Sequence, residues 1–541
     1  MVRTRAADDP LMLEEGSNIV VPAAAPASPS AAATAAPTAE ATAAASPHAR
    51  PQTRTDVGTA IRNGLKLGSS LFATWTVAVL LRFLLPRFLG PEQFGTFNFS
   101  DTFSATYFAL LGLGVDTYIQ KEMPVRPQHA SDFFGSLFAL RIVLSGVLLG
   151  ALALTLAMTH RSPQVQMLVL IFGCGQMFVM SNWTLAAMLQ AGTAVGGLAV
   201  INVASKLLWG GIVLAGLLLH AQLAVLATAV LISEFLKSAV LFGLVRTQYD
   251  LKLRLDARAL KEVLVAAFPF YVNTIVITLC SKLDVTLLEF LTGDAKQVGW
   301  YSASAGVASL AMLMSPLLSW VVMPLMSRAA ARSDEELWWV VRHAIAGIYI
   351  VTLPIMLMCV LGADLWIHVL FGAAFAPAAM SLRAQAPLFM LTYLAILLSM
   401  TLIIQKKGWK LTLVSIVGVI VNPILISTLV PAMSRWLGPG GGGVGAALGV
   451  VGMEAVVTSL LLYQLGRHAI DRYIVVTVGK SLLVCGLVTA LHVLLRPLGP
   501  LRLVADVVAY LALTFIIGVV KIAEVKGVLA TIRNKGALHA A

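Results

Sequence analysis

The sequence predicts an all-α polytopic membrane protein of about 14 transmembrane helices, built as two pseudo-repeated six-helix lobes plus two C-terminal helices. Hydrophobic residues make up 58% of the chain and charged residues only 12%, about half of the roughly 25% that soluble domains carry. A repeat divides the apolar segments into two similar sets. Asn202 in one segment is followed by Glu234 in the next, and Asn422 is followed by Glu454 at the same spacing. This pattern is typical of internally duplicated membrane bundles.

The predicted spans are joined by short connections, and each is long enough to cross about 30 Å of hydrocarbon as a helix. In order, they cover residues 64–88, 94–119, 133–158, 164–190, 193–219, 221–245, 264–291, 298–326, 338–361, 377–404, 410–432, 444–466, 473–495 and 501–523.

The predicted divisions of the chain follow these spans. They are a disordered cytoplasmic tail at 1–56, an N-terminal six-helix lobe at 57–245, a cytoplasmic linker at 246–263, a C-terminal six-helix lobe at 264–466, two additional transmembrane helices at 467–523 and a cytoplasmic tail at 524–541. The first tail is rich in Ala, Pro, Ser and Thr, so it is expected to bury too little apolar surface to fold alone.

The basic residues predict the orientation of the bundle. Alternate connections hold most of them: Lys121, Arg126, Arg246, Lys252, Arg254, Arg258, Lys261, Arg328, Arg332, Lys406, Lys407, Lys410, Arg467 and Arg472. By the positive-inside rule this side is the cytoplasm. Both termini are therefore expected to be cytoplasmic, and no large domain is expected to face outward.

Several functions are disfavoured by the same composition. The net charge of +12 could suggest nucleic acid, but the cations are spread over alternate connections, so no nucleic-acid partner is expected. The four Cys residues each lie alone, and the His residues are dispersed, which gives no metal site. No Ser/His/Asp grouping or Gly-rich phosphate loop is present. The sequence thus predicts no enzyme and no cofactor, apart from a coupling ion such as H+ or Na+.

Charged residues at membrane depth are the candidate functional residues, because an ionisable side chain inside a span usually faces the bundle interior or a wet cavity. Arg82, Asp101, Lys282 and Asp284 are predicted to share one layer, about 9 to 14 Å from the outer face. The basic groups would line a cavity for an anionic substrate, and the carboxylates would carry a coupling proton or sodium ion. The alternative is that Arg82 and Asp101 pair only for structure.

Further charged residues occur deeper in the segments. Glu289 lies seven residues after Lys282, so both should project from nearly the same helix face, and Glu289 is a candidate for ion coupling or gating. Lys206 and Glu234 have matching depths on adjacent segments, where a structural ion pair is the alternative to a functional role. Glu454 has Ile426 where the repeat counterpart of Lys206 would fall, so we expect ion coupling, or a packing or hinge role, at this carboxylate.

Arg141 in the third span and Asp116 near the inner end of the second are also candidates. They are expected either to line the substrate cavity or to anchor its cytoplasmic mouth.

The order of several motifs resembles one known family. The stretches are LLRFLLPRFLGPEQFGTFNFSDTF from Leu80, LGLGVDTYIQKE from Leu111, KLDVTLLEFLTGDAKQVGWYSASAGVASL from Lys282, and VNPILISTLVPAMSRWLGPGGGGVGAALGVVGMEAVVTSLLLY from Val421. Together they are similar to the oligosaccharide and polysaccharide-biosynthesis (Wzx-like, O-antigen type) flippases of the multidrug/oligosaccharidyl-lipid/polysaccharide exporter superfamily. The resemblance runs from about residue 62 to residue 466, and the last two spans fit the fourteen-helix plan.

This resemblance implies a flippase of the bacterial cytoplasmic (inner) membrane. A polyprenyl-pyrophosphate-linked oligosaccharide would enter a cationic cavity between the lobes from the cytoplasmic leaflet, with its tail in membrane lipid, and rocking of the lobes would expose it outside. Arg82 and Lys282 match the basic cavity role, and Asp284 matches the acid of the seventh helix. Polysaccharide polymerase machinery is the expected protein partner.

Three other functions stay open at this level. A multidrug or organic-cation antiporter and a lipid II flippase would have the same architecture. A drug exporter, however, should have a site dominated by carboxylates and aromatic residues. A membrane polysaccharide polymerase or ligase should carry a substantial loop for its active site, and the predicted connections are short.

Overall fold

The computed structural model describes residues 54–123, 130–192, 195–249, 254–311 and 315–520. Helices and turns make up these residues, and no β-strand occurs among them. The predicted C-terminal tail and nearly all of the predicted N-terminal tail lie outside the described residues.

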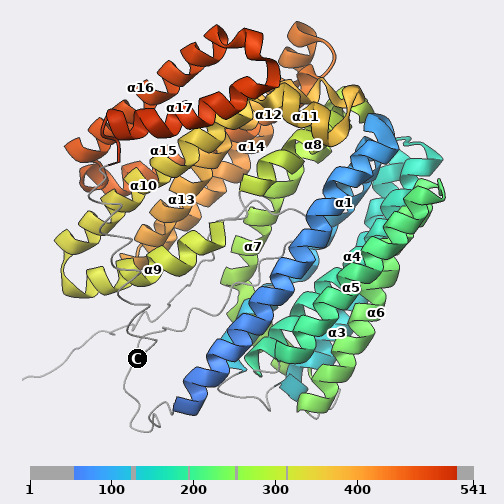
Figure 1. The fold of residues 1–541 in the computed structure, drawn as a ribbon. Coiled ribbons are helices and arrows are strands. Elements are labelled where there is room, and N and C mark those ends of the chain that lie inside the picture. Colours follow the sequence, from blue (N-terminus) through green and yellow to red (C-terminus); the bar gives the residue numbers. More distant parts are fainter. Residues whose placement is uncertain (1–53, 124–129, 193–194, 250–253, 312–314, 521–541) are drawn as a thin grey trace, which may run out of the picture.

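The described residues up to Tyr249, which we call the first half, form six α-helices. They are α1 (Arg54–Phe108), α2 (Val115–Glu122), α3 (Ala130–Met158), α4 (Pro163–Ala191), α5 (Val195–Leu218) and α6 (Leu223–Tyr249), with the short 3-10 helix η1 (Ala109–Gly112) after α1. Helix α4 packs against α1 and α6, and α5 packs against the same two helices. Figure 1 shows α3 to α6 as one group of long helices beside α1.

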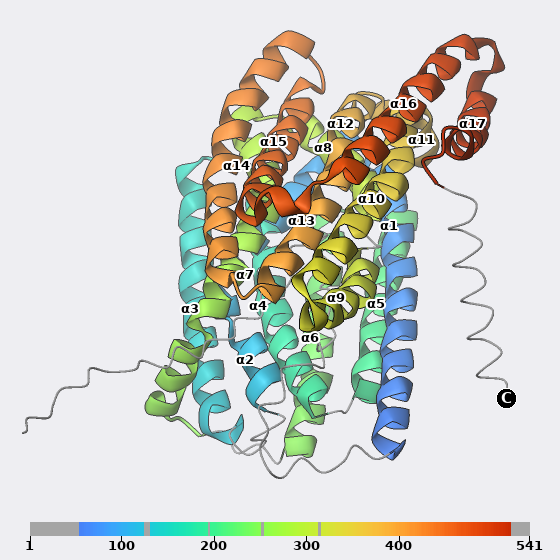
Figure 2. The same cartoon turned by 90° about the vertical axis from the view of Figure 1, so that its left-hand side faces the viewer.

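The second half contains the remaining helices. They are α7 (Ala257–Thr292), α8 (Ala295–Ala311), α9 (Ser315–Arg332), α10 (Asp334–Leu361), α11 (Ala363–Phe371), α12 (Ala378–Gln385), α13 (Pro387–Ile404), α14 (Gly408–Leu437), α15 (Gly441–Leu465), α16 (Arg472–Leu494) and α17 (Arg502–Ile516), with 3-10 helices η4 (Ala373–Phe375), η5 (Gly466–Ala469) and η6 (Arg496–Leu501). Helix α14 packs against α7 and α15, and α13 against α15. The pair α16–α17 packs on α10 at the edge of the bundle (Figures 1 and 2).

Side-chain caps fix where several helices begin. The Ser162 side chain accepts a hydrogen bond from the backbone N–H of Val165 before α4, and Asp256 caps α7 in the same way. Helix α7 ends at Gly293, whose φ of +61° suits a residue without a side chain. Because α6 runs to Tyr249 and α7 starts at Ala257, both ends of the predicted linker 246–263 are helical.

Helix α1 is broken at Gly90, which has φ +71° and ψ 172°. A straight helix of 55 residues would be about 80 Å long, far more than a membrane is thick. The segments before and after the break instead share one apolar core: Leu81 and Leu85 lie in the same cluster as Phe94 and Phe97. The break therefore carries two spans, as the sequence predicts for 64–88 and 94–119.

Helices α1 and α8 cross at very short range. A Cβ atom added at Gly95 would lie 1.8 Å from the backbone oxygen of Ala295, and one added at Gly299 would lie 1.9 Å from that of Pro91. The two glycines thus allow the first half to touch the second directly.

The described residues contain 11 helices that are long and apolar enough to span a membrane, or 12 if the bent helix α7 is one span. The count of 14 is therefore not confirmed. Residues 72–112, which include the break at Gly90, count as one of these helices although the sequence predicts two spans there. Helix α7 is bent by 59°, and the predicted span 298–326 is divided between α8 and α9. Breaks inside apolar segments, rather than missing segments, explain the difference.

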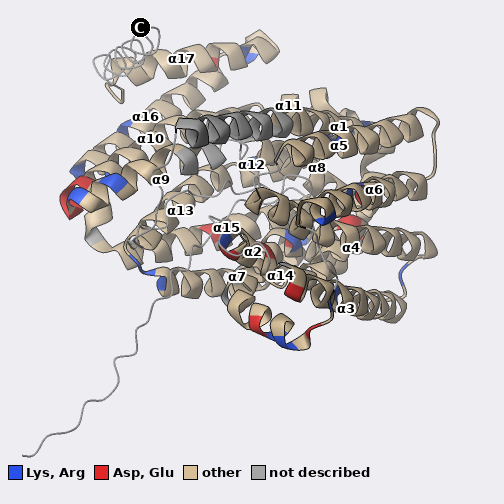
Figure 3. Cartoon of the chain, turned by 90° about the horizontal axis from the view of Figure 1, so that it is seen from below, with Lys and Arg blue, Asp and Glu red and all other residues tan. Residues whose placement is uncertain are grey.

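The flanks of the bundle are apolar. Large hydrophobic side chains such as Val143, Leu154 and Leu483 are exposed on the helix surfaces. In Figure 3 most of the ribbon carries no charge, and one group of charged residues lies in the middle of the view near α2, α4 and α6. The chain is thus a multi-pass membrane protein with charged residues in its interior.

The two halves are joined at one end of the bundle. We call the end with the α3–α4, α5–α6 and α7–α8 connections, predicted to face away from the cytoplasm, the outer end, and the opposite end the inner end. Two buried clusters mix both halves near the outer end, for example through Leu217 with Phe371 and through Leu156 with Val298. At the inner end the cluster around Ile119 packs α7 against α2 to α6, and the separate cluster around Val341 contains residues of α8 to α16, so among the described residues no buried cluster there joins α8 to α16 to the first half. Apolar packing therefore closes the outer end.

Candidate functional site

A cavity of about 530 Å³ lies between the two halves. Residues of α1 and α4 to α6, together with α7 of the second half, line one side, and residues of α8 and α12 to α15 line the other. Among the described residues, four basic and four acidic side chains line it: Arg82, Lys206, Lys237, Lys282, Asp101, Glu234, Asp284 and Glu454. Seven of the nine predicted site residues thus reach one cavity, and Lys237, which the sequence suggested only as a neighbour of Glu234, joins them.

The carboxylates on α1 and α6 are held by neutral amides. The Gln176 side chain donates a hydrogen bond to Asp101 at 3.2 Å, and the Asn182 side chain donates one to Glu234 at 2.9 Å. Both amides come from α4, which lies between the two carboxylate-bearing helices. Neither amide stands out in the sequence, because single neutral polar residues are common in membrane helices.

The remaining two cavity carboxylates also accept hydrogen bonds from neutral groups. The Tyr301 hydroxyl donates to Asp284 at 2.6 Å, and the backbone N–H of Val285 donates to the other oxygen at 2.8 Å. Glu454 accepts a hydrogen bond from Thr392 of α13. Each of the four carboxylates is therefore satisfied by a neutral donor.

The cations of the cavity are not paired with its carboxylates. Arg82 donates to the Ser309 hydroxyl of α8, and the Lys206 ammonium lies 4.2 Å from the centre of the Trp209 ring. Lys282 is 7% exposed, with Asp101 and Asp284 as its acidic neighbours. Within the described part of the chain, no salt bridge of 4.0 Å or less involves any of the eight charged cavity residues.

Two predicted pairings are therefore not formed. Lys206 and Glu234 are electrostatic neighbours but do not reach ion-pair distance, because Glu234 turns to Asn182 and Lys206 to Trp209. Arg82 and Asp101 are also not an ion pair, because Ser309 and Gln176 take their polar atoms.

The two repeated Asn residues differ in their contacts. Asn422 is fully buried and donates to the backbone oxygen of Cys280 at 3.3 Å, which ties α14 to α7. Asn202 lines the cavity. The repeat seen in the sequence thus places both carboxylates in one cavity but not the two amides in equivalent positions.

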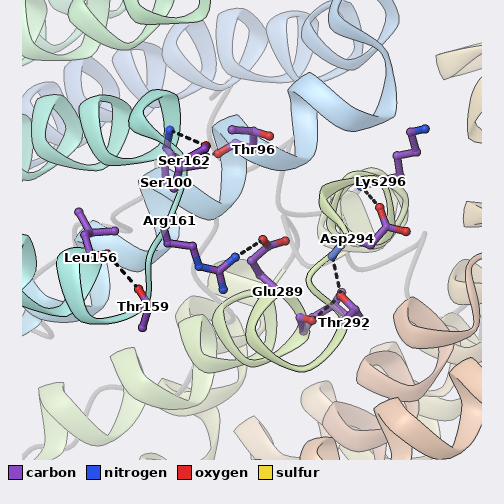
Figure 4. A network of polar contacts seen from close by, with 12 residues as sticks. Thr96, Ser100, Leu156, Thr159, Arg161, Ser162, Glu289, Thr292, Asp294 and Lys296 are labelled. Carbon is purple, nitrogen blue, oxygen red and sulfur yellow. Dashed lines mark hydrogen bonds and ion pairs between the residues drawn. The ribbon is translucent and has the colours of Figure 1, made fainter.

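Glu289 is placed outside the cavity, contrary to the expectation from its spacing to Lys282. It forms an ion pair of 2.7 Å with Arg161 of the α3–α4 connection. The Arg161 guanidinium also lies 4.7 Å from the ring centre of Phe290 and 5.4 Å from that of Phe99. Figure 4 shows Arg161 pointing toward Glu289 near the α7–α8 connection. Because Glu289 follows Lys282 by seven residues on α7, it lies about 10 Å nearer the outer end, where Arg161 reaches it.

Arg141 is also placed away from the cavity. Its guanidinium donates to the Thr184 hydroxyl at 2.7 Å and lies 3.9 Å from the Asp116 carboxylate. It borders a separate pocket of about 190 Å³ among phenylalanines of α3, α4 and α6. The pair Arg141–Asp116 therefore links helices within the first half.

The charged residues of the cavity are arranged for binding. Among the described residues, no group of three or more His, Cys, Asp or Glu side chains could hold a metal ion. Unpaired ammonium groups beside neutral hydroxyls and amides are instead suited to binding an anionic, hydrogen-bonding molecule.

Comparisons with solved structures show the fold. The chain is similar to the lipid II flippase MurJ in an inward closed conformation, with 13% identity, a TM-score of 0.63 and coverage of 83% of this chain and 97% of that chain. It is also similar to an inward-facing multidrug resistance MATE family transporter of the MOP superfamily, with 15% identity, a TM-score of 0.57 and coverage of 72% and 94%. An outward-facing transporter of this kind gives 16% identity, a TM-score of 0.51 and coverage of 75% and 95%.

Sequence comparison gives the family. No curated protein sequence matches the chain significantly. A family model described as "Polysaccharide biosynthesis protein" matches residues 60–330, which is half of the chain and includes Arg82, Asp101, Lys282 and Asp284 of the cavity. The protein therefore belongs to the polysaccharide biosynthesis protein family.

Proposed function

We propose that the protein is a flippase that moves polyprenyl-pyrophosphate-linked oligosaccharide repeat units across the bacterial cytoplasmic (inner) membrane by alternating access. The product would serve the synthesis of a surface polysaccharide such as O-antigen, capsule or exopolysaccharide. Both termini would be cytoplasmic, and polysaccharide polymerase machinery would take over the flipped unit. The family membership and the flippase fold support this reading.

One observation carries the proposal: the cavity carboxylates are satisfied by neutral donors, while its cations are not paired with them. Equal numbers of acids and bases would make the cavity indifferent to charge if they were paired with one another. Because Lys282 has no ion-pair partner among the described residues, its ammonium is available to a pyrophosphate. The four basic side chains in the cavity repel an organic cation, which disfavours a drug exporter.

The cavity supplies what this substrate needs. A pyrophosphate-sugar group cannot enter hydrocarbon without a large desolvation cost, so it requires a polar path. The polyprenyl tail can stay in lipid. Packing that joins the halves at the outer end leaves the substrate to enter from the inner end, and separation of the outer contacts would release it outside.

Glu454 is the best-placed candidate for ion coupling. It lies on the second-half side of the cavity, and Thr392 is its hydrogen-bond donor. A carboxylate without a cation partner can bind a proton or a sodium ion and release it again, which would link substrate movement to an ion gradient. Asp284, Asp101 and Glu234 are the other acidic groups that face the cavity.

The first test is transport by variants of the two central cations. Arg82→Ala and Lys282→Ala should each lower translocation at least tenfold, since a hydrogen bond to a charged group contributes about 1.5–3 kcal/mol. Membrane abundance should stay normal, because no carboxylate loses an ion-pair partner. The matched control is Arg87→Ala, an exposed arginine of the same helix outside the cavity.

Translocation is measured in cells that lack the chromosomal gene, from the leaflet location of lipid-linked oligosaccharide and the amount of surface polymer. Accumulation facing the cytoplasm with loss of surface polymer supports the flippase. Normal surface polysaccharide together with retention of cationic dyes by cells that lack the gene would favour a multidrug exporter over the flippase. Unchanged translocation in the double variant would reject the role of the two cations. Glu454→Gln, assayed in vesicles with an imposed proton or sodium gradient, should abolish the response to one of them.

A further inference from the structure

The two sides of the cavity differ in chemistry. Seven of its eight charged residues come from α1, α5, α6 and α7. On the other side, Glu454 of α15 is the one charged group among the described residues, and the polar groups from α8, α12, α13 and α14 are all neutral: Tyr301, Ser302, Ser309, Gln385, Thr392 and Ser415. We call this second set the neutral wall. A pyrophosphate fits the charged side, and a molecule rich in hydroxyl or acetamido groups fits the neutral wall.

Gln385 is the unusual member of the neutral wall. It is the last residue of α12, lines the cavity and is only 2% exposed. Neither its amide nitrogen nor its amide oxygen has a hydrogen-bond partner among the described residues, and the same holds for the Ser302 hydroxyl on the adjoining helix α8. Leaving a buried donor or acceptor without a partner costs about 1–3 kcal/mol. A methionine of similar size would avoid this cost, so packing alone does not explain a glutamine.

We propose that Gln385 is a specificity-determining residue that recognises the saccharide of the lipid-linked substrate. This inference rests on the proposed function. When the pyrophosphate lies against the charged side, the first sugars face the neutral wall. The Gln385 amide then turns to donate from its nitrogen to one sugar oxygen and to accept from a neighbouring hydroxyl or acetamido N–H. Ser302 is placed to add a further hydrogen bond.

The neutral wall also suits recognition of sugar rather than of phosphate. An amide holds one donor and one acceptor in a fixed plane, which matches adjacent hydroxyl groups of a pyranose. It carries no charge, so it gains little from a bare phosphate. A site built to hydrogen-bond a hydroxyl discriminates strongly against a ligand that lacks it, because its polar atoms are then left unpaired.

The direct test is binding to the purified full-length protein in lipid nanodiscs. One probe is undecaprenyl diphosphate without sugar, and the other is the polyprenyl-diphosphate-linked oligosaccharide pool extracted from cells that lack the gene. Gln385→Met should lower the affinity for the oligosaccharide pool about tenfold and leave the affinity for undecaprenyl diphosphate unchanged. Lys282→Ala should weaken both. Thermal stability of Gln385→Met should be equal to or higher than that of the wild type, since unpartnered polar atoms are removed.

The matched control is Gln190→Met. Gln190 does not line the cavity, and its amide oxygen accepts a hydrogen bond from Gln120 at 3.0 Å. This variant should therefore change neither affinity. A lower melting temperature of Gln385→Met with unaltered binding would assign Gln385 a purely structural role and overturn the inference. Equal affinity of the wild type for both probes would also overturn it while leaving a lipid-diphosphate flippase intact. Binding of neither probe would reject the proposed function itself.

Discussion

Replacing Glu289 by glutamine should make the outer end open more often. The carboxylate accepts from Arg161 at 2.7 Å, and the two side chains are only 8% and 18% exposed. Hydrogen bonds that involve a charged group are about twice as strong as neutral ones. Glutamine can still accept from Arg161, and the contacts of the guanidinium with Phe99 and Phe290 remain. We therefore expect the closed state to lose about 2 kcal/mol, which corresponds to an about 30-fold larger open fraction.

The assay uses Cys280, which lines the cavity. The other described cysteines, Cys174, Cys359 and Cys485, are replaced by alanine, and a membrane-impermeant thiol reagent is added to cells from outside. The rate of Cys280 modification reports how often the outer end opens. Glu289→Gln and Arg161→Gln should each raise this rate about 30-fold, and the double variant should not exceed either single variant by more than about twofold.

The control is an ion pair of similar length at the inner end. Arg332 and Glu336 lie 2.6 Å apart but are 69% and 36% exposed, on neighbouring helices joined by one turn. Exposed pairs contribute about 0–1 kcal/mol, so Glu336→Gln should leave the modification rate within about fivefold of the parent. If Glu289→Gln gives no more modification than Glu336→Gln, the ion pair does not hold the outer end closed and the reasoning is wrong.

Two further predictions concern packing. Gly95→Ala and Gly299→Ala should each lower the free energy of unfolding by about 3 kcal/mol or more, because the new methyl group would overlap a backbone oxygen of the facing helix. Both variants should yield less folded protein from membranes, measured by size-exclusion chromatography. The control Gly146→Ala, whose methyl group would meet nothing within 4 Å, should yield as much as the wild type. His492→Ala should lower the melting temperature in detergent, because Asp506, fully buried and 2.5 Å from the His492 ring, would lose its partner at a cost of about 3–5 kcal/mol. The double variant His492→Leu with Asp506→Leu should recover most of that loss, and a double variant as unstable as the single one would contradict this account.

The arrangement of the charged residues could largely be predicted because charge inside a span is rare. Arg82, Asp101, Lys282 and Asp284 stand out in apolar surroundings, and the cost of exposing them to lipid directs them to the interior whatever the helix packing. The same argument found Glu454, although its repeat partner pairs with a different residue than expected. Helical architecture followed equally from composition, and the family motifs lie where the cavity and the α1–α8 crossing are built.

What the sequence left out depends on contacts between distant segments. Glu289 was assigned to the cavity from helical periodicity, which describes direction but not depth, and its partner Arg161 comes from a connection of a few residues. Gln385 and Tyr301 carry no charge, so nothing in their surroundings distinguishes them from polar residues that only join helices. The count of 14 spans is not confirmed, because the bends within α1 and α7 and the division at α8–α9 change how one apolar stretch is counted.

The balance of charges in the cavity has an electrical consequence. The described cavity residues include four basic and four acidic side chains, whose formal charges cancel when all are ionised. The membrane potential then neither helps nor opposes the conformational change of the empty transporter. A bound pyrophosphate makes the loaded cavity negative. In a cell whose interior is negative, outward movement of each such charge is favoured by about 2.3 kcal/mol per 100 mV. The loaded step would then be electrogenic, and the voltage would add to any ion gradient that is coupled through Glu454.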